Sequence, residues 1–252
     1  MQGLNRISIT MLLQSIGNMV GDYYECEFHL EFPSWQEGEK VATILPVPVF
    51  VPAGLAASLR LEEKYLVQGS FEITTFKNGE VWSQGLSITA SACDPVHRFT
   101  SINKAFLFGK TLPLVKKDGT PSFEVIGIHG KKKSTLKMPV IVKEKIGINK
   151  NANGYYDYKD MYFNLTATVD SETGKGRGAS LFPYLAGQAV CVEGSLDVYY
   201  YNGKTQISVF VGGANHHIEG VTISQEEKKN RPVEVKYINS PKTGDSNFNG
   251  EF

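Results

Sequence analysis

Tyrosines and lysines recur together in the second half of this 252-residue chain, and the two residue types suit a polyanion that carries planar rings. A tyrosine ring gives a base a face to stack on, and a lysine ammonium neutralises a phosphate. Tyr199 and Tyr201 lie two positions apart, as do Lys143 and Lys145, and Tyr162 lies in another strand-like segment. Since residues two apart share one face of a β-strand, each pair is predicted to project from a single face.

Strand phase predicts which of these rings face solvent. In the segment that ends at Tyr201 the even positions are mostly aliphatic, so Tyr199 and Tyr201 face outward and Tyr200 joins the core. In the segment around Tyr162 the odd positions are apolar, so Tyr162 faces outward. The alternative reading of such tyrosines, as partly buried caps on the ends of a barrel, stays open.

Further candidates lie on neighbouring segments. A polar loop before Tyr162 and a hairpin loop upstream supply more rings and cations, although a lysine run is often only a solvated face. Phe76 is predicted outward at the position that Tyr201 holds in a sequence repeat, and Trp35 is predicted in a loop, whereas Trp82 shares its phase with core residues. The additional candidates are Tyr155, Tyr156 and Tyr158 on the polar loop, Lys131, Lys132 and Lys133 in the hairpin loop, and Lys204 after a turn.

The repeat sets the organisation of the chain. Gly69-Ser70 and Gly194-Ser195 lie 125 positions apart, and each stands in an alternating segment followed by an Asn-Gly turn. An internal repeat of half the chain length predicts two copies of one small domain. Pro46 and Pro48 fall in the predicted third strand, and proline is tolerated only at edges or bulges, so distortion is expected there.

Hydrophobic alternation predicts the elements of each copy. The first copy has strands near 4–16, 22–32, 41–51, 65–76 and 81–91, with a short helix near 53–64. The second has strands near 101–108, 122–129, 138–147, 160–169, 189–200 and 205–212, with a short helix near 178–186. A helix between the third and fourth strands of a five-stranded Greek key is the order of the OB-fold. The predicted fold is therefore mainly β, with two tandem OB-fold barrels, a short helix in each, and a flexible C-terminal tail.

Charge divides the predicted domains. Residues 1–97 carry 5 Lys/Arg against 11 Asp/Glu, and residues 98–222 carry 16 against 10. The second domain is therefore expected to face a polyanion, and the first, with Glu25, Glu27 and Glu31 on one strand face, to serve assembly. Residues 223–252 form a polar tail with an acidic, Phe-ended tip.

Sequence patterns for catalysis or metal binding are weak. Gly109-Lys110-Thr111 lacks the earlier glycine of a phosphate-binding loop, and the five histidines lack metal-ligand spacing. Three distant cysteines indicate neither a disulfide framework nor a zinc site. We expect no enzyme activity, cofactor or metal, no membrane segment, and a cytoplasmic location.

The chain resembles the bacterial and phage single-stranded DNA-binding protein family. The resemblance rests on the opening strand 102–110, the run 184–196, its weaker copy in 61–73, and the C-terminal residues 244–252. It implies a protein that coats and protects single-stranded DNA in replication, recombination or repair, with low sequence specificity. It also implies a homodimer that pools four OB units, and a tail whose Phe248, Glu251 and Phe252 recruit replication and repair proteins. A protein-interaction or assembly module and an RNA-binding module of the OB type remain the alternatives.

Overall fold

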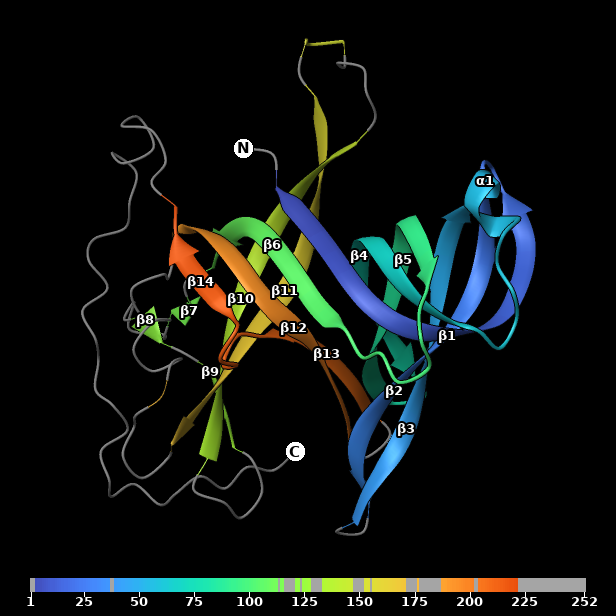
Figure 1. Cartoon of the computed structure of the whole chain (residues 1–252). Helices are drawn as coiled ribbons and strands as arrows, with labels where there is room; N and C mark the ends of the chain where they lie inside the picture. The colour runs from blue at the N-terminus through green and yellow to red at the C-terminus, as the bar shows by residue number, and fades with distance from the viewer. Residues whose placement is uncertain are drawn as a thin grey trace. The chain divides into compact units, whose positions relative to one another are not determined.

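The computed structural model of the chain is nearly all β (Figure 1). It describes residues 3–36, 39–112, 114–115, 121–122, 124–127, 133–146, 152–154, 156–170, 176, 187–201 and 204–221. Strands hold most of these residues, and α1 (Ala53–Ala56) is the one helix among them. No helix in this described part is long and apolar enough to cross a membrane.

The chain divides into two compact units, which we call the N-unit and the C-unit. The N-unit joins Asn5–Phe106 to Ser195–Ser208. The C-unit holds the described residues of Met1–Leu4, Leu107–Gly194 and Val209–Phe252. A hairpin from late in the chain thus packs with the first half, while the proposed domain boundary after residue 97 remains a prediction.

Five strands make up the first half of the chain. They are β1 (Leu4–Val20), β2 (Tyr23–Gln36), β3 (Glu39–Pro52), β4 (Lys64–Asn78) and β5 (Val81–Pro95). They bond in the order β1-β2-β3-β5-β4, and β4 pairs again with β1, so the path closes on itself. The side chains buried within it are mostly aliphatic or aromatic, among them Ile7, Ile9, Met11, Leu13, Cys26, Phe28, Val47, Val49, Val67, Phe71 and Ile88.

The second half repeats this strand order. Its strands are β6 (Asn103–Thr111), β7 (Leu114–Val115), β8 (Pro121–Ser122), β9 (Glu124–Gly127), β10 (Lys133–Ile146), β11 (Asp157–Asp170), β12 (Ala189–Tyr201), β13 (Lys204–Phe210) and β14 (His217–Gly220). The path runs β6-β10-β11-β13-β12, and β12 pairs again with β6. In both halves the third and fourth strands of the path, β3 with β5 and β11 with β13, pair in parallel. Buried residues of the C-unit include Leu107, Met138, Val140, Val142, Phe163, Leu165, Val190, Val192, Val209 and Val211.

Side-chain alternation explains why these segments are strands. In β2, Cys26 and Phe28 are buried, whereas Glu25, Glu27 and Glu31 are exposed, as the sequence predicts. Period-two alternation places one set of side chains in the core and leaves the other set in water. The outer face of β2 is consequently acidic.

The predicted helix over 53–64 is wrong in length, because α1 stops at Ala56. The Ser58 amide and hydroxyl both donate to the Leu55 carbonyl oxygen, at 3.2 and 2.8 Å, which closes a tight turn in place of further helix. Glu62 has a positive φ of 64°, which a helix does not allow. The predicted helix over 178–186 lies outside the described residues.

The expected distortion at Pro46 and Pro48 is also wrong. β2 and β3 pair without a register shift from Tyr23↔Pro52 to Gln36↔Glu39. On its other side, in the described residues, β3 pairs with β5 only at Val49 and Phe50. Two prolines two positions apart direct their ring nitrogens to the same side, so both fit on the side where β3 has no partner strand. Trp35, predicted in a loop, falls within the longer β2.

The repeated glycines lie where two strands come unusually close. A Cβ at Gly194 would lie 2.5 Å from the Phe210 carbonyl oxygen. At Gly69 it would meet the Thr89 carbonyl oxygen at a shorter distance still, next to a register shift between Gln68 and Gly69. Only glycine lets the neighbouring backbone approach this closely.

Gly69→Ala and Gly194→Ala are each expected to lower the free energy of unfolding by about 1–3 kcal/mol, because the added methyl must displace a neighbouring strand. Gly54→Ala in α1 is the matched control, since nothing lies within 4 Å of its added Cβ. Alanine favours a helix over glycine by about 1 kcal/mol. Urea unfolding measures all three variants, and equal stabilities would contradict the close-approach argument.

Candidate nucleic-acid interface

Figure 1 shows the β10–β11 hairpin of the C-unit. Register and burial place most of the described candidate residues on one face of this hairpin. The strands pair in unbroken register from Lys133↔Asp170 to Ile146↔Asp157. One face is buried and includes Val140, Val142, Met161, Phe163 and Leu165. Because side chains alternate, the residues between them project to the opposite face.

We call that opposite face the Tyr/Lys face. It consists of Lys143, Lys145, Tyr156, Tyr158, Asp160 and Tyr162. Tyr162 is 60% exposed, Tyr158 42% and Tyr156 37%. Rings this open to solvent in a strand are available for stacking against a planar ligand.

The lysines of the Tyr/Lys face already have partners. Lys143 stands opposite Asp160 in the register, with 3.5 Å between its Nζ and Asp160 Oδ1. The Lys145 Nζ lies 3.5 Å from the centroid of the Tyr156 ring, a cation–π distance, while Tyr158 is its cross-strand neighbour. The face therefore combines two cations, three open aromatic rings and one carboxylate.

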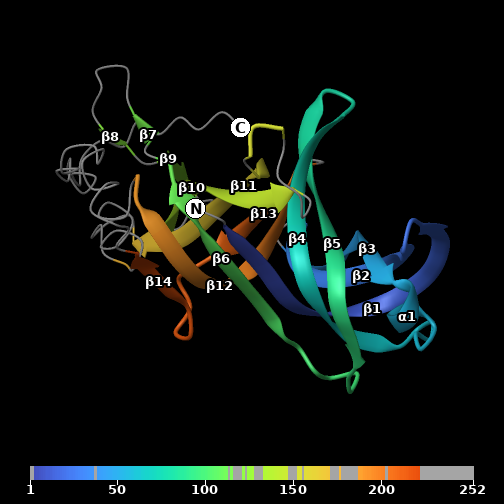
Figure 2. The ribbon, with the colours of Figure 1, turned by 90° about the horizontal axis from the view of Figure 1, so that it is seen from above.

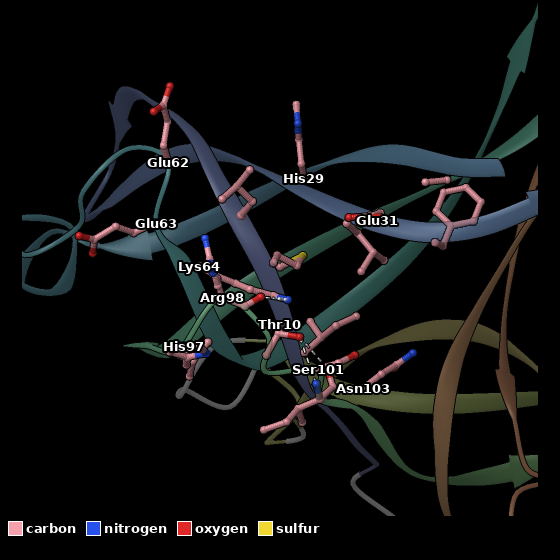
Figure 3. A pocket seen from close by; sticks show the side chains of 18 of the residues that line it. Thr10, His29, Glu31, Glu62, Glu63, Lys64, His97, Arg98, Ser101 and Asn103 are labelled. Atoms are coloured by element: carbon pink, nitrogen blue, oxygen red, sulfur yellow. Dashed lines mark hydrogen bonds between the residues drawn. The ribbon is translucent and has the colours of Figure 1, made fainter.

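The N-unit contains a pocket of about 1180 Å³ with a different chemistry (Figure 3). Its charged lining includes Glu31, Glu62 and Glu63 against Lys64 and Arg98. The Lys64 Nζ donates to the Arg98 carbonyl oxygen at 3.2 Å, and the Arg98 guanidinium lies 4.6 Å from the Phe99 ring centroid. With no surplus of cations, this pocket does not suit a polyanion.

Two of the three cysteines are buried, and the described residues form no cluster suited to a metal ion. They hold no group of three or more His, Cys, Asp or Glu side chains placed to bind a metal ion. Burial raises the pKa of the Cys93 thiol to about 12, with smaller contributions from Cys26 and Asp94. Burial also raises the pKa of Cys26, so both thiols stay protonated and unreactive at neutral pH.

Comparison with solved structures relates this architecture to known proteins. A deletion mutant of the single-stranded DNA-binding protein from Thermus aquaticus matches with a TM-score of 0.54 and 15% identity, over 89% of this chain and 98% of that one. The chain shares the fold of single-stranded DNA-binding proteins. The wild-type Thermus aquaticus protein matches with a TM-score of 0.52 and 15% identity, over 89% of this chain and 96% of that one. No protein-family profile and no curated protein matches the sequence.

Within this single-stranded DNA-binding-protein fold, the predicted residues fall into three groups. Tyr156, Tyr158, Tyr162, Lys143 and Lys145 come together on the Tyr/Lys face, and Tyr158 lies in β11 rather than in the predicted loop. Phe76, which is 47% exposed, Tyr199, which is 44% exposed, and the half-buried Lys204 belong to the N-unit. Outside the described residues or side chains are Tyr155, Lys131, Lys132, Lys133, Trp35, Tyr201, Phe248, Glu251 and Phe252.

Two core predictions are wrong. Tyr200 is 36% exposed, because β12 continues beyond Val198, its last buried residue. Trp82 is 60% exposed, although it shares the phase of Leu86 and Ile88, because it pairs with Lys77 near the turn of the long β4–β5 hairpin (Figure 2). Alternation identifies the face of a strand but not the point at which the core ends.

Asp160 is the residue of the Tyr/Lys face that the sequence argument did not single out. A signal for it exists, since it lies two positions before Tyr162 and must share its face. Its pairing with Lys143 depends on the register of β10 against β11, which the sequence does not specify.

The Phe76 ring is exposed, but it also packs against the β4–β5 hairpin. An added Cβ at Gly85 would lie 3.3 Å from Cε1 of the Phe76 ring, so this ring covers the glycine across the β4–β5 hairpin. An aromatic ring over a cross-strand glycine shields the backbone and stabilises the pair. Phe76 is therefore partly committed to packing, unlike Tyr162.

Tyr162→Ala is expected to change the free energy of unfolding by less than about 0.5 kcal/mol, because the ring stands in solvent. Phe163→Ala, one residue along on the core face and 1% exposed, is expected to cost about 3–5 kcal/mol. The free energy of unfolding in urea, measured for both variants, tests whether Phe163 faces the core and Tyr162 faces solvent. A large loss of stability in Tyr162→Ala would mean that its ring is part of the core.

Proposed function

We propose that this protein binds single-stranded DNA with low sequence preference, chiefly through the Tyr/Lys face. The observation that carries the proposal is the row of exposed tyrosines beside lysines on one side of the β10–β11 hairpin. Aromatic stacking and phosphate neutralisation together suffice for binding that does not read sequence. The fold shared with the Thermus aquaticus protein supports the same reading.

We further propose that the chain is a tandem pair of OB barrels, with domains at 1–97 and 98–222. The strand order repeated in β1–β5 and in β6, β10, β11, β13 and β12 supports two barrels. The second domain binds the DNA, since the first exposes Glu25, Glu27 and Glu31 on β2. Three carboxylates along one strand repel phosphates.

The corresponding cellular role is to coat and protect single strands during replication, recombination or repair, without turnover of a substrate. Tyr199, Tyr201 and Lys204, and the lysines at 131–133, are further candidates for contacts with the DNA. The tail ending at Phe252 would recruit partner proteins through Phe248 and Glu251. This role places the protein in the cytoplasm.

Tyr162→Ala is expected to weaken oligo-dT binding by about 5- to 150-fold, since stacking contributes about 1–3 kcal/mol per base. Phe76→Ala is the matched control from the first domain and is expected to leave the affinity nearly unchanged. Fluorescence titration over a salt series measures both variants. Wild-type affinity should fall steeply with salt, because each neutralised phosphate releases counterions.

Two results would count against this function. Wild-type protein that fails to bind oligo-dT, or binds it no better at low salt than at high salt, would reject DNA binding. If Phe76→Ala weakens binding as much as Tyr162→Ala does, the proposal that the second domain binds the DNA is rejected. Competition with oligo-U and with duplex DNA determines whether a single DNA strand is the preferred ligand.

We also propose a homodimer, in which two chains pool four OB units. An exposed apolar group at the end of the β1–β2 hairpin offers a surface for association: Ile16, Met19, Val20 and Tyr23 are 39, 54, 54 and 37% exposed. Exposed apolar patches of this kind often mark protein interfaces. Equilibrium sedimentation should give twice the chain mass of 27.8 kDa. A monomer at all concentrations would reject the dimer.

A further inference from the structure

One carboxylate lies in the middle of the Tyr/Lys face. Along β11 the outward positions are Tyr158, Asp160 and Tyr162, so Asp160 is flanked by the two most exposed rings of the hairpin. Its side chain is 40% exposed and its Oδ1 lies 3.5 Å from Lys143 Nζ. The acid is thus open to solvent and to any ligand that reaches both rings.

A strand bound across this face must pass Asp160. The two tyrosines are four residues apart, which is about 13 Å along a β-strand. Bases stacked on both rings would be joined by a backbone that runs between them, over Asp160 and Lys143. A phosphate and the Asp160 carboxylate then compete for one ammonium group.

The geometry points to Asp160 as a built-in competitor for the phosphate, a residue that limits affinity and hastens release of the DNA. The inference rests on the proposed function, because it assigns a role to one residue of that binding face. In the unliganded protein Asp160 neutralises Lys143, so a phosphate can engage this lysine only by displacing the carboxylate. While Asp160 keeps Lys143 paired, this lysine neutralises no phosphate and releases no condensed cation from the DNA, so it adds little to the salt dependence.

The test is Asp160→Asn in the full chain, which removes the charge and keeps the size of the side chain. Oligo-dT affinity at low salt is expected to rise about two- to five-fold, the range set by the strength of an exposed ion pair. The slope of log affinity against log salt should steepen by about 0.7, the contribution of one newly engaged phosphate on a single strand. Stopped-flow dissociation should slow by a similar factor.

Two further variants make the result specific. Asp157→Asn removes the same charge from the same strand, but Asp157 pairs with Ile146 and lies in the alternate phase. Its affinity and salt slope should stay close to those of the wild type. In the double variant Lys143→Ala with Asp160→Asn, the salt slope should return to the wild-type value, because the gain depends on the released lysine.

The outcomes separate the two proposals. Suppose that the wild type binds oligo-dT and that Tyr162→Ala lowers its affinity. If Asp160→Asn then shows equal or lower affinity with an unchanged salt slope, the competitor role is overturned and DNA binding stands. Equal gains from Asp157→Asn and Asp160→Asn would overturn it too, since net charge alone would then explain them. If the wild type does not bind oligo-dT at all, the proposed function itself fails. Thermal unfolding checks that all variants are folded.

Discussion

The close approach of neighbouring backbones at Gly69 and Gly194 is the constraint on which the rest of the structure depends. In each half of the chain a carbonyl oxygen of the adjacent strand occupies the place where a side chain would begin. The approach brings β4 against β5 and β12 against β13, two neighbouring pairs within the closed strand paths. A side chain there would require the neighbouring strand to shift.

Closure fixes which side chains point outward. Once β10 and β11 curve around a core that contains Met138, Val140 and Phe163, the intervening positions have no alternative to the outer face. The Tyr/Lys face is the opposite surface of the same two strands. The strands that carry its rings are held by backbone hydrogen bonds and by core packing. A rigid scaffold of this kind lets exposed side chains bind a ligand with little loss of conformational freedom.

Much of this was predictable from the sequence. Period-two alternation correctly placed most strands of both halves but not β7 or β14, and it also gave the outward Tyr162 and the shared face of Lys143 and Lys145. It failed for Trp82 and Tyr200, because phase continues along a strand after the core has ended. It could not provide the pairing of Lys143 with Asp160, since register is a property of two strands together.

The repeat in the sequence and the compact units in space do not coincide. Within the N-unit the Thr205 amide donates to Ser83 Oγ at 3.4 Å, and the Ile207 amide donates to Gln84 Oε1 at 2.7 Å. The second Gly-Ser hairpin is therefore anchored on β5 of the first half. Side chains that accept hydrogen bonds from a backbone far along the chain cannot be recognised from periodicity, which reports only local order.

The prolines of β3 also bear on whether this strand can pair with a strand of another molecule. A strand with unpaired amides and carbonyls can capture a strand from another molecule and start aggregation. Pro46 and Pro48 have no amide hydrogen to offer on the side of β3 that lacks a partner among the described residues. A second chain would find no regular ladder of donors there. The two prolines thus hinder the pairing of a second sheet with this side of β3.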